Sequence, residues 1–333
     1  MPHAVSMADV AREAGVSLMT VSRAIRNRGD ISAATRERVL EVAERLGYQP
    51  SGIARSLVTR HTGTLGLVMP DVANPFFSDL ASGAEDAAYA EGYGLFLCNT
   101  NEDRHREQAQ LRSLFEKRVD GVIICSSRMS KEQLREAISR FAAVVLVNRR
   151  LPGSHAGAVL VDNAGGARLM TEHLLSSGHE RVAFLGGPGR SRGRQERLRG
   201  YQRCLRASGL TYRAEWAPHS PPTIDGGRLA AQSLLTAYPE VSALFCYNDL
   251  VAVGALEAAA ELGRKVPETL AIGGFDGIAL SRLVTPPLTT CQVNTRGLGI
   301  QAMRLLLAQI SQDPQGSREV VISPELVVRQ SAP

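Results

Sequence analysis

The chain has 333 residues, of which 44% are hydrophobic and 21% charged, an ordinary composition for a globular protein with room for more than one core. No apolar run approaches the length of a membrane span, and the first residues lack the apolar stretch of a signal peptide, so we expect a cytoplasmic protein. The five cysteines are scattered, without the spacing of a metal site or a disulfide framework. We therefore expect buried, reduced thiols, no metal and no cofactor.

The net charge of +5 is concentrated near the N-terminus. Residues 1–61 hold nine Arg and six acidic residues, so 9 − 6 = +3 of the charge lies in under a fifth of the chain. Clustered cations favour a polyanionic partner such as nucleic acid, although a solvated charged surface has the same composition.

Three short helices are predicted within residues 1–50. Ser6 caps the first, Gly15 ends it, Ser17 caps the second (LMTVSRAI), and Ser32 caps the third. Two short helices joined by a tight turn that contains Gly are typical of a helix-turn-helix, and a plain helical hairpin is the alternative. The second helix presents apolar, hydroxyl and arginine side chains outward, a mixture that suits thymine methyls and the paired acceptors of guanine.

The string VSMADVAREAGVSLMTVSRAIRNRGDISAATRERVLEVAERLGYQPSGIARSL closely resembles the DNA-binding module of the lactose/galactose repressor family. The matching pieces DVAREAGVS, TVSRAI, TRERV, LGYQP and ARSL follow one another without a gap. The resemblance implies that Leu18, Met19 and Arg23 read bases in the major groove, and that Ser17, Thr20 and Ser22 contact phosphate. Ser6, Asn27 and Tyr48 are further DNA contacts that the same resemblance implies.

After LGYQP, the family has a hinge that becomes helical on operator DNA. The resemblance places this hinge helix at residues 51–61, with Ala54 and Leu57 three positions apart. It implies that Leu57 enters the minor groove and opens a base step, at a cost of a few kcal/mol that further contacts offset. Interdomain packing is the alternative role for Leu57.

From Leu65 onward, eight apolar runs alternate with helical patterns, which predicts an α/β fold with parallel sheets between helices. About 270 residues exceed one compact sheet, and the alternation restarts near Arg181, so we expect two doubly wound lobes with a cleft between them. Ligands of such sheets bind at the carboxyl ends of strands. Several runs end there in polar residues, namely Asp71, Asn148, Asp162, Asn248 with Asp249, and Asp276.

This body also resembles the same family and, beyond it, the periplasmic sugar-binding proteins. Matching pieces include NPFF (74–77), KRVDGVI (117–123), FCYNDLVAVGA (245–255) and GFDGIALSRLVTPPLTT (274–290). We therefore predict a periplasmic-binding-protein-like, effector-binding and dimerisation domain over 62–333. Its first lobe would comprise about 62–163 with 292–320 crossing back, and its second lobe 164–291 with 321–333.

The resemblance, carried over position by position, implies an effector site. Aromatic faces cover the apolar side of a sugar, while amide, carboxylate and guanidinium groups bond its hydroxyls. Core packing is the alternative for the two phenylalanines, and a loop cap is the alternative for Asp276. The implied effector-binding residues are Asn74, Phe76, Phe77, Asn148, Arg197, Asn248 and Asp276.

One position departs from the family pattern. Pro222 stands where family members often place an aromatic residue that stacks on the ligand. The nearby stretch 188–196 (PGRSRGRQE) is unusually cationic, and Arg190, Arg192 and Arg194 would suit an anionic effector such as a sugar acid or sugar phosphate. A solvated loop is the alternative.

Two other classes of protein compete with a regulator. GGPGRSRG (186–193) looks like the dinucleotide loop of an enzyme, but its glycine spacing misses GxGxxG by one residue. A transport binding protein would share the lobes but not the helix-turn-helix. We therefore expect no enzyme but a homodimeric repressor of palindromic operator DNA, controlled by a sugar-like small molecule that acts as inducer or corepressor. We expect the dimer interface on 74–90 and 277–285.

Overall fold

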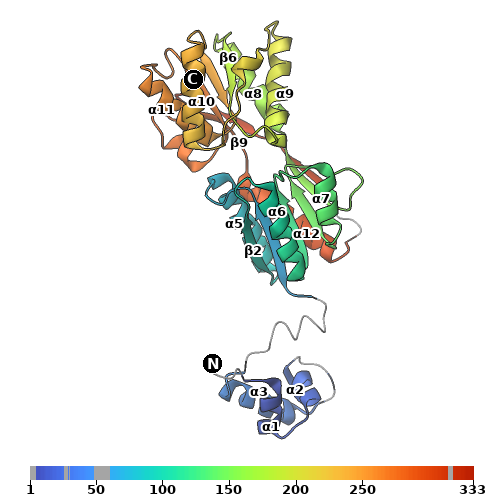
Figure 1. Cartoon of the computed structure of the whole chain (residues 1–333). Helices are drawn as coiled ribbons and strands as arrows, with labels where there is room; N and C mark the ends of the chain where they lie inside the picture. Colours follow the sequence, from blue (N-terminus) through green and yellow to red (C-terminus); the bar gives the residue numbers. More distant parts are fainter. Residues whose placement is uncertain (1–4, 26–28, 30, 49–60, 314–317) are drawn as a thin grey trace. The chain divides into compact units, whose positions relative to one another are not determined.

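The computed structural model describes residues 5–25, 29, 31–48, 61–313 and 318–333. It divides the chain into two compact units, Met1–Thr62 and Gly63–Pro333 (Figure 1). Asn27, Ala54 and Leu57, and all of the predicted hinge helix except His61, lie outside the described residues. Their predicted roles therefore stay predictions.

The described part of the small unit contains three helices, α1 (Met7–Ala14), α2 (Leu18–Ile25) and α3 (Ala33–Arg45). The N-terminus of α1 has a capping box, in which the Ser6 hydroxyl accepts from the Asp9 amide at 3.3 Å and Asp9 Oδ2 accepts from the Ser6 amide at 3.0 Å. Both groups satisfy donors that the first turn of a helix leaves free, which confirms the predicted start of α1.

The turn between α1 and α2 is built as predicted. Gly15 has a φ of 65°, a left-handed conformation that glycine adopts without strain. The Ser17 hydroxyl accepts from the Thr20 amide at 3.2 Å and so caps α2. The three helices enclose a small core of short side chains, namely Val10, Ala11, Ala14, Val21, Ala24, Val39, Val42 and Ala43.

The large unit begins with a six-stranded, wholly parallel sheet of order β10-β5-β4-β3-β1-β2. Alternate residues of β3 face opposite sides: Ile123 packs with α5 and α12, whereas Val122 and Ile124 pack with α6 and α7. Helices thus cover both faces, which explains the continuous apolar runs of these strands. The elements of this lobe are β1 (Thr64–Met69), α5 (Pro75–Ala90), β2 (Gly94–Asn99), α6 (Arg104–Glu116), β3 (Gly121–Cys125), α7 (Lys131–Ile138), β4 (Val144–Val147), β5 (Gly157–Val161), α12 (Thr295–Ile310) and β10 (Glu319–Ile322).

The second lobe holds a five-stranded sheet of order β11-β9-β8-β7-β6. Its strands are parallel except that the edge strand β11 pairs antiparallel with β9, a departure from the wholly parallel sheet that we predicted. The elements of this lobe are α8 (Asn163–Ser176), β6 (Val182–Leu185), α9 (Arg192–Ala207), the 3₁₀ turn η1 (Ala214–Trp216), α10 (Ile224–Ala237), β7 (Ala243–Cys246), α11 (Asp249–Glu261), β8 (Ala271–Asp276), the 3₁₀ turn η2 (Ala279–Arg282), β9 (Thr289–Gln292) and β11 (Glu325–Val327).

The eight predicted apolar runs are strands β1 to β8. The chain passes between the lobes after β5, after β9 and after β10. Gln292 still pairs in the second sheet, and residues 321 and 322 still pair in the first, all within two residues of the predicted lobe boundaries. The sequence reading missed the short strands β9, β10 and β11, of which β10 and β11 are separated only by Ser323 and Pro324.

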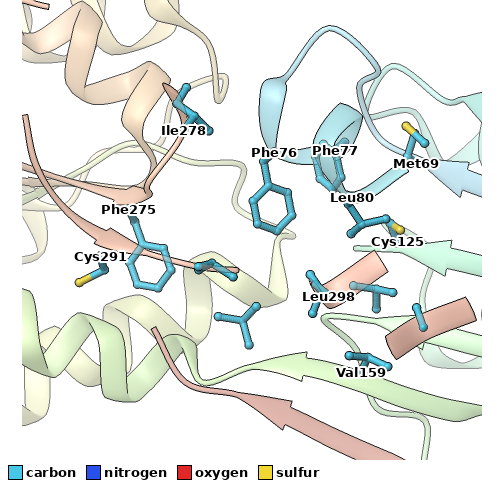
Figure 2. Packing of buried hydrophobic residues seen from close by; sticks show 14 of the residues in the cluster. Met69, Phe76, Phe77, Leu80, Cys125, Val159, Phe275, Ile278, Cys291 and Leu298 are labelled. Atoms are coloured by element: carbon cyan, nitrogen blue, oxygen red, sulfur yellow. The ribbon is translucent and has the colours of Figure 1, made fainter. Parts of the chain in front are cut away.

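One hydrophobic cluster joins the two lobes. Figure 2 shows Phe76, at the start of α5, between Phe77 on the side of the first lobe and Phe275, in β8, on the other side. The rings of Phe76 and Phe77 meet edge to face with their centroids 5.1 Å apart. Both phenylalanines are therefore core residues that also reach the boundary between the lobes.

The five cysteines are buried and unbridged, as predicted. Burial raises the pKa of the Cys291 thiol to about 12, so this thiol stays protonated near neutral pH. Within the described ranges, no helix is both long and apolar enough for a membrane span. The same ranges contain no group of three His, Cys, Asp or Glu side chains arranged to hold a metal ion.

Candidate functional site

A cavity lies between the lobes of the large unit, at the carboxyl ends of strands from both sheets. It encloses about 30 Å³ in this structure, which is about the volume of one water molecule. All seven predicted effector-binding residues line it. They are Asn74, Phe76, Phe77 and Asn148 from the first lobe, and Arg197, Asn248 and Asp276 from the second. Their convergence is a structural fact, whereas their role in binding stays a prediction.

Three asparagines of the cavity each use the side-chain oxygen to fix the backbone. Asn74 Oδ1 accepts from the Phe76 amide at 3.0 Å and caps α5, and Asn248 Oδ1 accepts from the Val251 amide at 3.0 Å and caps α11. Asn148, whose φ is 58°, accepts from the Val161 amide at 3.1 Å.

The orientation of each of these amides follows from that bond, because only the oxygen can accept from a backbone N–H. Among the described residues, the Nδ2 groups of Asn74, Asn148 and Asn248 have no hydrogen-bond partner. The cavity therefore has three amide NH₂ groups available as donors to a ligand.

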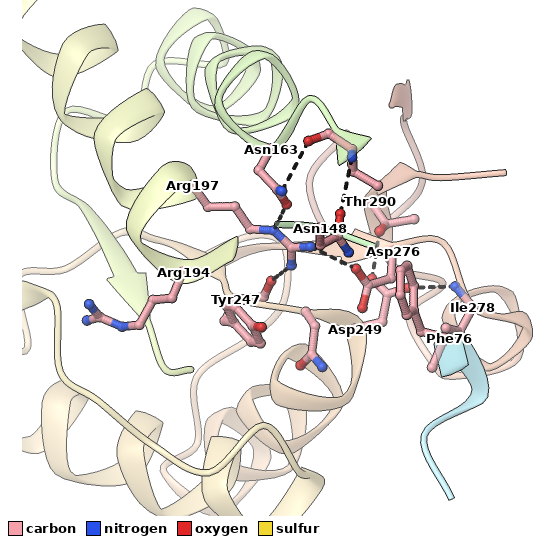
Figure 3. Close-up of polar contacts among 12 residues, drawn as sticks. Phe76, Asn148, Asn163, Arg194, Arg197, Tyr247, Asp249, Asp276, Ile278 and Thr290 are labelled. Carbon is pink, nitrogen blue, oxygen red and sulfur yellow. Dashed lines mark hydrogen bonds and ion pairs between the residues drawn. The ribbon is translucent and has the colours of Figure 1, made fainter. Parts of the chain in front are cut away.

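Arg197 is the central cation of the second lobe. It donates to Asn163 Oδ1 at 2.9 Å, to Asp276 Oδ1 at 3.1 Å and to the Tyr247 carbonyl oxygen (Figure 3). Its guanidinium carbon lies 3.6 Å from the centroid of the Phe275 ring. Hydrogen bonds, an ion pair and a stacked ring thus hold a guanidinium whose side chain is only 5% exposed.

A second buried carboxylate supports the turn that carries Asp276. Asp249 Oδ2 accepts from the Ile278 amide at 2.8 Å, and its Oδ1 accepts from the Thr290 hydroxyl at 2.6 Å (Figure 3). These bonds fix the segment just after Asp276. Asp276 itself has a φ of 104°, which is unusual for a residue other than glycine. Asp249 therefore positions Asp276 rather than lining the cavity.

Both carboxyl groups titrate far above their usual range. Burial raises the pKa of Asp276 to about 6, although the neighbouring Arg197 opposes this shift. Burial, and next the charge of Asp276, raise the pKa of Asp249. The charge of Asp276 thus disfavours the ionised form of Asp249, and Arg197 is the cation that keeps Asp276 largely ionised at neutral pH.

The first lobe has its own ion pair in the cavity, which the sequence reading missed. Arg128, in the stretch after β3, donates through Nη2 to Glu102 Oε1 at 2.8 Å and through Nε to Glu102 Oε2. Its Nη1 donates to the Ser126 carbonyl oxygen at 2.6 Å. Other lining residues that we did not predict are Asn163, Ser191, Gly193 and Tyr247.

A sequence signal existed for part of this set. Ser126 directly follows the apolar run GVIIC, and Asn163 stands two residues after the end of β5 at Val161, so both obey the rule that polar residues after parallel strands meet at one edge. Pro222 also lines the cavity, so an apolar ring stands where we noted that the family often has an aromatic one.

The anionic-effector hypothesis fails at Arg194. This side chain is 4% exposed and donates to the Gly186 carbonyl oxygen at 3.0 Å and to the Ala217 carbonyl oxygen at 2.7 Å. Its guanidinium also lies over the Phe184 ring, and it points away from the cavity in Figure 3. Arg192 pairs with Glu196 at 3.3 Å. Arg194 is thus a structural residue, and neither arginine is a free cation.

In the small unit, α2 presents a surface that its core does not use. Leu18 is 53% exposed and Met19 62% exposed, and Arg23 lies on the same exposed side of the helix. Isolated apolar side chains of this size are common on surfaces, but two adjacent ones on the first turn of a helix offer a contact face. Ser22 is half-buried beside them.

The hydroxyls predicted to contact DNA have structural partners as well. The Ser6 hydroxyl donates to Asp9 Oδ2 at 2.6 Å, and the Ser17 and Thr20 hydroxyls lie 2.9 Å apart. Tyr48 is half-buried against the core of the unit, with its amide donating to the Ala43 carbonyl oxygen at 2.8 Å. Ser6, Ser17, Thr20 and Tyr48 therefore stabilise the domain, and their contact with DNA stays a prediction.

Two family models match the chain. The model described as bacterial regulatory proteins, lacI family, matches residues 6–51. The model described as periplasmic binding proteins and sugar binding domain of LacI family matches residues 62–330. The two matches meet near the boundary between the compact units and together span most of the chain.

Curated relatives and a solved structure agree with these models. The ribose operon repressor of Halalkalibacterium halodurans is 37% identical over 97% of this chain and 96% of its own length. The HTH-type transcriptional repressor PurR of Vibrio vulnificus is 34% identical over 97% of both chains. The transcriptional regulator CelR in complex with cellobiose aligns with a TM-score of 0.75 and 30% identity over 98% of this chain and 99% of its own. The chain therefore belongs to the LacI family of DNA-binding transcriptional repressors that respond to a small-molecule effector.

Proposed function

We propose that this chain is a dimeric repressor that leaves its operator when a neutral sugar binds between the lobes. The observation that carries the proposal is the charge balance of the cavity. Its two guanidiniums, Arg128 and Arg197, are each bonded to one carboxylate, Glu102 and Asp276. Two positive and two negative groups leave a cavity without net charge, which suits a polar ligand that is itself neutral.

The remaining groups complement hydroxyls. The asparagine NH₂ groups donate to oxygen lone pairs, and the ionised Asp276 accepts from ligand hydroxyls. Phe76 and Pro222 offer apolar surface for the C–H face of a sugar ring. The 37% identical relative named as a ribose operon repressor supports ribose as the first sugar to test.

On the DNA side, we propose that Leu18, Met19 and Arg23 read bases and that Ser6, Ser17, Thr20, Ser22, Asn27 and Tyr48 contact the backbone. Two copies would bind the two halves of a palindrome, because a two-fold protein matches two-fold DNA. Ala54 and Leu57 would contact the operator centre through the hinge. A protein that acts on DNA would work in the cytoplasm.

The proposed dimer interface uses 74–90 and 277–285, as we predicted from the sequence. Large apolar side chains on and beside these segments support it, since Tyr89 is 78% exposed and Leu283 74% exposed. Phe96 and Leu97 of the edge strand β2 are also exposed. A second copy would cover this apolar surface.

We propose no catalytic role for the cavity. Its polar groups are amides, hydroxyls, two paired guanidiniums and two paired carboxylates, without a nucleophile activated by a neighbouring base among the described residues. The relatives reported above are named as regulators, which supports the same reading.

The test joins selection of operators from random DNA with titration of ligands. We expect a palindrome of two major-groove half-sites, which D-ribose or another neutral sugar releases, and which ribose 5-phosphate and sugar acids do not release. Failure to enrich any sequence would refute the DNA-binding part. Release by acidic sugars alone would refute the neutral effector, and tighter binding with the sugar would make it a corepressor.

A further inference from the structure

Arg128 is a charged residue of the cavity to which the family resemblance assigned no role. Its side chain is 8% exposed, yet it lines the same cavity as Asn148 and Arg197. It comes from the first lobe, directly after β3, whereas Arg197 comes from α9 in the second lobe. The cavity thus has a guanidinium on each side of the cleft.

A count of hydrogen-bond donors shows what Arg128 has left to offer. A guanidinium carries five N–H groups. Nε and one N–H of Nη2 bond Glu102, and one N–H of Nη1 bonds the Ser126 carbonyl oxygen, so 5 − 3 = 2 remain. One of these is on Nη1 and one is on Nη2; we call this pair of donors the fork, and it can bond two neighbouring oxygen atoms.

The backbone around Glu102 is arranged to hold this fork in place. Asn101 and Glu102 have φ values of 51° and 59°, two successive left-handed residues that are not glycine. The Glu102 amide donates to the Pro70 carbonyl oxygen at 3.0 Å, which ties this turn to the end of β1. Backbone strain of this kind persists where the surrounding structure imposes it, commonly at ligand sites.

A purely structural ion pair explains the arrangement less well. Buried ion pairs contribute little net stability, because the cost of removing both charges from water offsets their attraction. A pair that served only to join two loops would not need to border the cavity or to leave two donors free there.

We propose, on the basis of the neutral-sugar function above, that Arg128 is a specificity-determining contact of the first lobe, which binds two adjacent hydroxyl oxygens of the effector. Glu102 is the positioning residue that orients the fork and neutralises it. A ligand bonded by Arg128 and by Arg197 at once would join the two lobes. The inferred ligand class is therefore a neutral sugar with a vicinal diol.

The experiment measures calorimetric affinities of the full-length protein for D-ribose and for 2-deoxy-D-ribose and 3-deoxy-D-ribose. The variants are Arg128→Lys, Arg128→Met and Glu102→Gln, with Arg112→Met, an exposed arginine of α6, as the matched control. Lysine keeps the charge but loses the fork, so Arg128→Lys should weaken D-ribose binding by about 10- to 100-fold.

Selectivity distinguishes a contact from a structural role. In the wild type, at least one deoxy sugar should bind about tenfold more weakly than D-ribose. In Arg128→Met, that deoxy sugar and D-ribose should bind with equal affinity. Equal weakening of all three sugars, or unchanged selectivity in Arg128→Met, would overturn the role of Arg128 alone. If the wild type binds none of these sugars and no other neutral diol, the proposed function itself is overturned and the role of Arg128 with it.

Discussion

In the small unit, the first turn of α2 leaves Leu18 and Met19 exposed although a core of short side chains lies beneath them. In the large unit, the cavity does the reverse, since Arg197 and Asp276 are charged and almost fully buried. Folded proteins ordinarily bury apolar groups and expose charged ones, and departures from this rule occur at functional sites. The cost in folding free energy differs between the units. An exposed leucine contacts water in the unfolded chain too, so its exposure costs little, whereas a buried charge loses its hydration when the chain folds.

The sharpest test of this difference is Arg197→Met, which leaves Asp276 buried without its cation. We expect the free energy of unfolding of the large unit to fall by about 3–5 kcal/mol and effector binding to fall by more than about 100-fold. Urea unfolding and calorimetry measure the two effects. Arg199→Met, on the exposed side of α9, is the control and should change stability by no more than about 0.5 kcal/mol. Equal unfolding free energies of Arg197→Met and Arg199→Met would contradict the proposed cost of a buried, unpaired carboxylate.

The small unit should respond in the opposite way. Replacing Leu18 and Met19 by Ala should lower discrimination between operator variants by about 1–3 kcal/mol without lowering the unfolding free energy of the unit. Competitive binding to single-base operator variants, together with thermal unfolding, measures this. Leu40→Ala, on α3 and 46% exposed, is a matched control that should leave discrimination unchanged. A loss of stability in the double variant would place these side chains in the core instead.

The buried charge also predicts opposite effects of pH on binding and on stability. Burial raises the pKa of Asp276 to about 6, above its unfolded value of 3.8. The folded protein therefore binds the proton more tightly than the unfolded chain, so this group makes the fold less stable as pH rises from about 4 to above 6. Effector hydroxyls need the ionised form as acceptor, so affinity should instead fall about fivefold from pH 6 to pH 5.

Calorimetry between pH 5 and pH 8 checks this prediction. Asp276→Asn should bind weakly and should lose the fall in affinity from pH 6 to pH 5, since its amide does not titrate. A wild-type affinity that stays constant down to pH 5 would mean that Asp276 does not accept from the ligand as a carboxylate.

The smallest effect is expected at Asp249. In Asp249→Asn the amide oxygen still accepts from the Ile278 amide, and the Thr290 hydroxyl reverses to accept from the new NH₂ group. We expect a change of at most about 1 kcal/mol in unfolding free energy, against about 2–4 kcal/mol for Asp249→Ala, which leaves both partners unsatisfied. If thermal unfolding shows the two variants equally unstable, the charge itself supports the turn.

Local chemistry made part of the fold predictable. Ser6, Gly15 and Ser17 mark the ends of α1 and the start of α2 through bonds to residues within three positions, so the sequence alone predicts them. Strands β9 to β11 were not predictable in this way. They are three or four residues long, and their pairing depends on distant partners: β10 and β11 pair with residues more than 30 positions away, and β9 pairs with β8 at a separation of 16 positions.

The site shows the same division. Asn148, Asn248 and Asp276 follow apolar runs, and the rule for parallel strands brings them together. The pair of Glu102 and Arg128 joins two loops through a left-handed turn, which no periodicity reveals. The error at Arg194 was avoidable, because Ser191 caps α9, and that start places Arg194 and Arg197 three apart on its buried face.

The asparagines that cap α5 and α11 also limit how this repressor lineage could acquire a new effector. Replacing Asn74 or Asn248 by Ala would remove a helix cap worth about 1 kcal/mol along with a ligand donor. Aspartate keeps an oxygen for the cap and exchanges the NH₂ donor for a negatively charged acceptor. A single Asn-to-Asp change would therefore redirect the cavity toward cationic ligands, such as amino sugars, while both helices keep their first turns.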